Sequence, residues 1–61
     1  MLERKAIAII IRWLKIDEKD AQMIYNGVYR IGEDNFSAYI TNDDKLEICK
    51  NGEPIHRIST F

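Results

Sequence analysis

The chain has 61 residues, of which 46% are hydrophobic and 31% charged, and its net charge at pH 7 is −1. A domain of this length buries only about 60% of the surface that its unfolded chain exposes, so we expect one domain of marginal stability. Cys49 is the only cysteine, which excludes an intramolecular disulfide framework and fits a reducing, cytoplasmic compartment. No Cys and His cluster has the spacing of a structural zinc site, so self-association into a dimer is the common stabilising device that remains.

The apolar run of residues 6–11 is too short to cross a bilayer, because a membrane-spanning helix needs about 20 apolar residues. Arg12 and Lys15 follow this run closely. A secretory signal peptide needs a small-residue cleavage site, which Trp13 and Leu14 do not supply. We therefore expect no membrane partner.

A helical repeat of apolar side chains predicts a first helix over about residues 2–15. At about 100° per residue, these side chains fill a continuous arc of about 220°, interrupted only by Glu3. Isoleucine also favours strands, so a strand over residues 6–11 is the alternative. A helix that packs on a sheet needs an apolar arc of only about 100°. The remaining apolar surface would have to be covered by a second helix or by another copy of the chain. The residues expected to mediate self-association are Ile7, Ile9, Ile11, Trp13 and Leu14.

A second, short helix is expected over about residues 18–26. Asp17 has the character of an N-cap, and Asn26-Gly27 is typical of a left-handed helix end. The alternative is a single strand over residues 23–31, bent at Gly27.

The remaining sequence predicts an antiparallel meander, because short alternating runs are separated by turn residues. The fold class is therefore α+β, with one or two N-terminal helices packed on one face of a four-stranded antiparallel meander sheet. The expected strands are at about residues 28–31, 36–41, 45–50 and 54–59.

The turns between these runs set the expected strand registers. A GEDN loop, an NDD loop and a two-residue Asn51-Gly52 primed turn all place the apolar residues on one face. The pairs that follow are Ile31 with Phe36, Tyr29 with Ala38, Ile40 with Leu46, Ala38 with Ile48, and Ile48 with Ile55.

The opposite face of the sheet is polar, and it brings together the residue types of a nucleophilic site. In the expected register Glu47 lies across from His56, with Cys49 one pair away. A flat sheet face offers no pocket or oxyanion donors, so we expect no enzyme activity. The acidic turns lack the glycine and distal glutamate of an EF-hand, and no glycine-rich phosphate loop is present, so no metal or cofactor is expected.

The charges are unevenly distributed, with a net +3 in residues 1–16 and a net −4 in the rest. Two helices followed by a hairpin have the outline of a winged helix-turn-helix, but the second helix begins DEKD and would meet DNA with three acids. A basic stripe beside Trp13 also suits an interfacial membrane helix, which would leave the sheet uncovered. Nucleic-acid binding is the alternative function, through Arg4, Lys5, Arg12 and Lys15.

The leading hypothesis is a small non-enzymatic protein-binding module, acting as an adaptor, regulator or inhibitor by analogy with small proteins of phages and mobile elements. Its acidic turns would contact a target with a basic surface, and an exposed tyrosine would serve as a rigid anchor. The residues expected at this contact are Tyr39, Glu47, His56, Arg30, Glu33, Asp34, Asp43 and Asp44.

Overall fold

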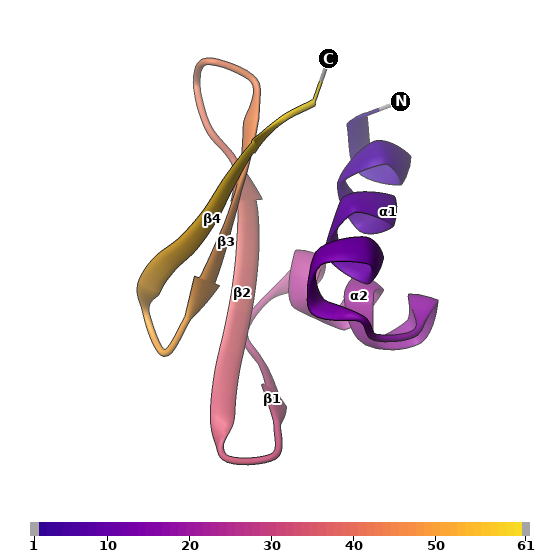
Figure 1. Ribbon diagram of the computed structural model, residues 1–61, viewed down its shortest axis with the longest axis vertical. Helices are drawn as coiled ribbons and strands as arrows, with labels where there is room; N and C mark the ends of the chain where they lie inside the picture. Colours follow the sequence, from indigo (N-terminus) through magenta and orange to yellow (C-terminus); the bar gives the residue numbers. More distant parts are fainter. Residues whose placement is uncertain (1, 61) are drawn as a thin grey trace.

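The computed structural model describes residues 2–60, with side chains from Glu3 onward. Two helices precede a four-stranded antiparallel sheet of strand order β1-β2-β3-β4, and both helices lie on the same side of it (Figure 1). This arrangement confirms the predicted α+β fold. The elements are α1 (Leu2–Leu14), α2 (Glu18–Asn26), β1 (Tyr29–Ile31), β2 (Asp34–Ile40), β3 (Lys45–Lys50) and β4 (Glu53–Ser59).

The two helices form a hairpin whose ends follow from local sequence. Lys15 takes a positive φ of 55° directly after α1, and Asp17 caps α2 by accepting a hydrogen bond from the amide of Asp20 at 2.9 Å. The amide of Gly27 donates to the carbonyl of Ile24 and ends the helix. Gly27 has an extended backbone with φ 166°, so the expected left-handed cap is wrong, as is the alternative strand over residues 23–31.

The hydrophobic core lies between the helices and one face of the sheet. Each of the large aliphatic side chains fully buried there contributes about 1.5–3 kcal/mol through removal from water. Each helix contributes a fully buried alanine to it, Ala6 from α1 and Ala21 from α2. The buried cluster consists of Ala6, Ile10, Ala21, Ile24, Ala38, Leu46 and Ile48.

The register between β2 and β3 is the expected one, with Ile40 opposite Leu46 and Ala38 opposite Ile48. The three-residue loop closes with Asp44 at φ 58°, as a type I turn followed by a left-handed residue requires. The register between β1 and β2 differs from expectation by two residues, because the chain turns on two residues and Ile31 pairs with Asp34. A shift of two leaves every side chain on its predicted face.

The register between β3 and β4 was predicted correctly at the turn and wrongly beyond it. Asn51-Gly52 forms the primed turn, with both φ angles positive, and Lys50 pairs with Glu53. A β-bulge then shifts the ladder, so that Ile48 pairs with His56 instead of Ile55. The side chain of Ile55 is 41% exposed. One extra residue reverses the faces of all that follow it, which explains the error.

Candidate functional site

Three side chains on adjacent strands meet on the sheet face that the helices leave uncovered. Glu47 on β3 lies directly opposite Tyr39 on β2 and Arg57 on β4. The Tyr39 hydroxyl donates a hydrogen bond to Glu47 Oε1. Arg57 donates to Glu47 Oε2 from Nε at 3.0 Å and from Nη2 at 2.9 Å. We call these three residues the Glu47 cluster.

The Glu47 cluster buries its carboxylate beneath its two partners. Glu47 is only 3% exposed, although it lies on the helix-free face. Tyr39 remains 48% exposed, and the side chain of Arg57 61% exposed. A buried carboxylate requires hydrogen-bonding partners to offset its lost hydration, and both of its oxygens have them here. The two exposed side chains are thereby held in fixed positions.

Hydrogen bonding keeps the Glu47 cluster in one charge state at neutral pH. The bond from Tyr39 and, after it, those from Arg57 lower the pKa of Glu47, because both partners stabilise the carboxylate. The same carboxylate raises the pKa of Tyr39, whose ionisation would lose the hydrogen bond, and that of Arg57. With its proton directed at Glu47, the Tyr39 hydroxyl presents acceptor lone pairs to solvent.

Arg57 is the member of this cluster that the sequence reasoning missed. The expected pairing of Glu47 with His56 is wrong, because the bulge in β4 moves His56 to the other face of the sheet. His56 lies on the helix-covered face, where its ring centroid is 4.7 Å from that of Trp13. Cys49 stays on the open face, so the geometry does not assemble a Cys, His and Glu site. The opposite charges of Glu47 and Arg57, which favour pairing across adjacent strands, were the signal in the sequence that could have identified the correct register.

The two acidic turns lie at opposite ends of β2 (Figure 1). The strand has seven residues, which at about 3.3 Å each separate the turns by roughly 20 Å. At one end, Asp34 pairs with Lys50 at 3.7 Å and Glu33 is exposed. At the other, Asp43 pairs with Lys45 at 3.8 Å. The structure therefore does not unite the two turns in a single acidic surface.

Asp44 and Arg30, near the two ends of β2, form hydrogen bonds that involve backbone carbonyls of the turns. The backbone carbonyl of Asp44 accepts hydrogen bonds from the hydroxyl and the amide of Thr60, at 2.6 and 3.3 Å. Arg30 is exposed on β1, and its Nε donates to the carbonyl of Gly32 at 3.0 Å. Arg30 thus lies close to the β1–β2 turn that holds Glu33, whereas Asp44 lies in the β2–β3 turn at the other end of β2.

Helix α1, with Lys15 directly after it, presents both the apolar and the basic residues singled out from the sequence. Trp13 is half exposed beside His56, while four aliphatic residues are partly buried against the core: Ile7, Ile9, Ile11 and Leu14. The basic side chains are all exposed, and within residues 3–60 none of them joins an ion pair: Arg4, Lys5, Arg12 and Lys15. The ammonium of Lys5 donates to the carbonyl of Thr60 at 3.4 Å.

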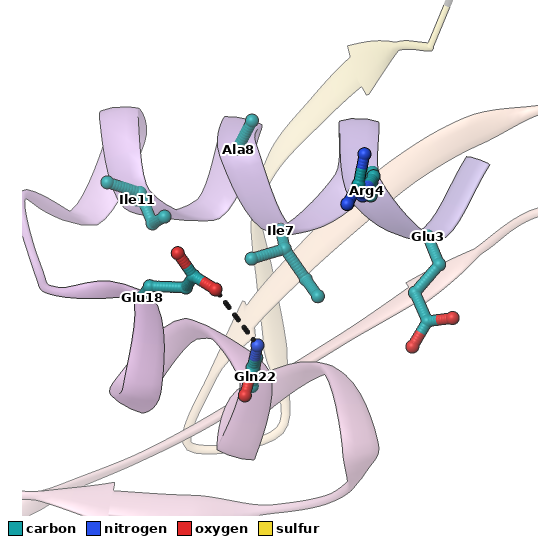
Figure 2. Close-up of a pocket in the computed structure, with 7 residues that line it drawn as sticks. All are labelled: Glu3, Arg4, Ile7, Ala8, Ile11, Glu18 and Gln22. Atoms are coloured by element: carbon teal, nitrogen blue, oxygen red, sulfur yellow. Dashed lines mark hydrogen bonds between the residues drawn. The ribbon is translucent and has the colours of Figure 1, made fainter. Parts of the chain in front are cut away.

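A groove of 570 Å³ runs between α1 and α2 on the side away from the sheet (Figure 2). Its centre is apolar and its edges are charged. On the α2 side, the amide of Gln22 donates to the carboxylate of Glu18 at 3.2 Å. Sequence reasoning missed this contribution from α2, because only the folded hairpin brings it beside α1. The lining residues are Glu3, Arg4, Ile7, Ala8, Ile11, Glu18 and Gln22.

Within the part of the chain that the structure describes, no three side chains of His, Cys, Asp or Glu are grouped so as to hold a metal ion. Neither helix there has the length and apolar character to cross a membrane. Compared with protein-family models, curated proteins and solved structures, the sequence matches none. Function must therefore be inferred from the geometry of this chain.

Proposed function

We propose that the protein is a non-enzymatic protein-binding module, acting as an adaptor, regulator or inhibitor through the open face of its sheet. The observation that carries this proposal is the Glu47 cluster, in which a buried carboxylate fixes an exposed tyrosine and an exposed arginine. Tyrosine and arginine are enriched among the residues that dominate binding energy. Side chains that are already ordered lose less conformational entropy when a partner binds.

The chemistry of the cluster defines what a partner must offer. Since the Tyr39 hydroxyl donates its hydrogen bond to Glu47, its oxygen would accept a hydrogen bond from the partner. Arg57 keeps donors beyond those directed at Glu47, and these suit an acceptor. Besides Glu47, the nearby carboxylate of Asp43 raises the pKa of Arg57. The end of the sheet at the β2–β3 turn therefore also presents negative charge. A target with a basic surface near a polar backbone segment fits this combination.

Affinity capture with substituted proteins tests the proposal. The tagged chain is incubated with nuclease-treated lysate of the cells that produce it, and the retained proteins are compared among variants. We expect a near-stoichiometric protein that is retained by the native chain and lost with Tyr39→Ala and with Arg57→Ala. Arg12→Ala is the matched control, since this arginine is exposed on α1, on the helix side of the molecule. Equal retention by all four proteins, or no retained protein, would contradict the proposal.

The alternative function is nucleic-acid binding through α1, favoured by the exposed basic residues that form no ion pair within residues 3–60. Phosphate contacts make affinity fall steeply with salt, whereas a largely apolar contact responds weakly. Replacing Arg12 and Lys15 with glutamate would abolish this binding and leave binding at the sheet intact. Against this alternative, Glu18 and Asp20 place negative charge on the first turn of α2.

A further inference from the structure

The groove between α1 and α2 has an apolar floor with charges of opposite sign at two of its corners. Ile7 and Ile11 are partly buried in the floor, and Ala8 leaves room for a close approach. Figure 2 shows Arg4 on α1 and Glu18 on α2 at diagonally opposite corners, with Ile7 between them. Neither charged residue forms an ion pair within residues 3–60.

This pattern is complementary to itself. In a two-fold symmetric contact, if residue i of one copy touches residue j of the other, then j also touches i. A two-fold axis through the apolar floor exchanges the two corners. Each Arg4 would then face Glu18 of the partner subunit, and the two floors would cover each other. Glu3 also lines the groove, next to Arg4 on α1 in Figure 2, so this corner carries charges of both signs.

We propose that a second copy of this chain packs over the groove, groove to groove, forming a symmetric dimer held by Ile7, Ala8 and Ile11 and flanked by two pairs of Arg4 with Glu18. The net charge of −1 imposes little long-range repulsion between copies. This contact lies on the side of the helices away from the sheet (Figure 2), so it does not depend on the function proposed above.

The size of the surface predicts a weak dimer. A standard stable interface buries about 800 Å² on each partner. That is roughly a fifth of the 4425 Å² accessible surface of this chain, and a contact limited to one helix and the start of another offers less. We therefore expect a dissociation constant in the micromolar range or weaker, and a monomer at high dilution.

The test is sedimentation equilibrium from about 10 to about 500 micromolar protein, where a dimer of micromolar affinity is populated. The native chain is expected to move from a mass of 7.2 kDa toward twice that mass. Arg4→Glu and Glu18→Arg each replace two attractive contacts with two repulsive ones, so each is expected to raise the dissociation constant about tenfold or more. Both residues are exposed, so the fold is retained, which circular dichroism checks.

The decisive experiment mixes the two single variants, Arg4→Glu and Glu18→Arg. In the mixed dimer, one contact joins the two substituted side chains, whose charges are both reversed. The other contact joins the native Arg4 of one chain to the native Glu18 of the other, so both contacts are attractive and affinity is restored. Native mass spectrometry of differently tagged chains detects this mixed dimer.

Arg30→Glu and Glu33→Arg are matched controls in the sheet region, and they are expected to leave self-association unchanged. A monomer at every concentration, or a dimer that responds equally to the groove and control variants, would overturn the proposal.

Discussion

Glu47 is the residue whose environment departs most from a simple amphipathic sheet. The side chains of β3 alternate between the two faces of the sheet, and Glu47 points to the helix-free face. Its neighbours on both adjacent strands are long polar side chains that lie over it. The carboxylate is therefore buried by hydrogen-bonding partners instead of by an apolar layer. Leaving such a group without its partners destabilises the fold, because its lost hydration is no longer offset.

The depressed pKa of Glu47 predicts a specific acid sensitivity. Since the carboxyl binds its proton less readily in the folded than in the unfolded state, its contribution to stability is complete above the unfolded pKa and is lost as the pH falls through the folded pKa. Glu47→Gln should lower the melting temperature by several degrees at neutral pH, and this deficit should shrink below about pH 4. Thermal unfolding across the pH range measures both effects.

Two further variants check the cause. Glu33→Gln, at an exposed turn position, should leave the melting temperature at neutral pH almost unchanged. Tyr39→Phe should raise the pKa of the Glu47 carboxyl, as followed by its carbon chemical shift, because it removes the largest stabilising hydrogen bond. An unchanged titration in Tyr39→Phe would mean that the hydroxyl does not hold the carboxylate.

At the scale of elements, the β3–β4 turn also anchors the start of β2. The side-chain oxygen of Asn51 accepts from the amide of Asn35 at 2.9 Å, and its nitrogen donates to Asp34 at 3.0 Å. Its backbone has φ 54°, in the left-handed region where asparagine is tolerated and alanine is strained. One residue thus provides the turn conformation and links two strands.

Two substitutions at Asn51 separate these contributions. Asn51→Gly keeps the positive φ and loses both side-chain hydrogen bonds, so we expect it to lower the free energy of unfolding by about 1 kcal/mol. Asn51→Ala loses the same bonds and adds left-handed strain, so we expect a further loss of about 1 kcal/mol. Urea denaturation of the two variants measures the difference. Equal losses would show that the φ angle carries no energetic weight at this turn.

For the whole molecule, stability rests on few residues. At roughly 0.05–0.15 kcal/mol per residue, a chain of this length has a free energy of unfolding of about 3–9 kcal/mol. The largest fully buried side chains in residues 3–60 are four: Ile10, Ile24, Leu46 and Ile48. Truncating any one of these side chains removes a large fraction of the free energy of unfolding.

Ile48 and Ile55 provide a matched test, since the sequence predicts both in the core and the structure buries only Ile48. Ile48→Ala should lower the free energy of unfolding by about 2–5 kcal/mol, a large fraction of the total. Ile55→Ala should lower it by less than about 1 kcal/mol, because the bulge leaves this side chain exposed. Chemical denaturation compares them, and similar losses would contradict the observed register.

Sequence alone favoured the correct order and type of the elements, because each depends on local chemistry. The strand alternatives over residues 6–11 and 23–31 are both wrong. The helical repeat predicts α1, Asp17 begins α2, and Asn51-Gly52 sets the last turn. The face assignment of β2 and β3 also followed, since the side chains of a strand alternate with a fixed period of two. The error in the β1–β2 turn was harmless because it shifted the register by an even number.

Only the tertiary structure decided which side chains meet. The bulge in edge strand β4 places Arg57, and not His56, beside Glu47. The separation of the acidic turns along β2 and the position of Glu18 on α2 beside the α1 surface are likewise properties of the assembled fold. The physical reason is that helices and turns depend on neighbours in the chain, whereas a surface depends on contacts between residues far apart in it.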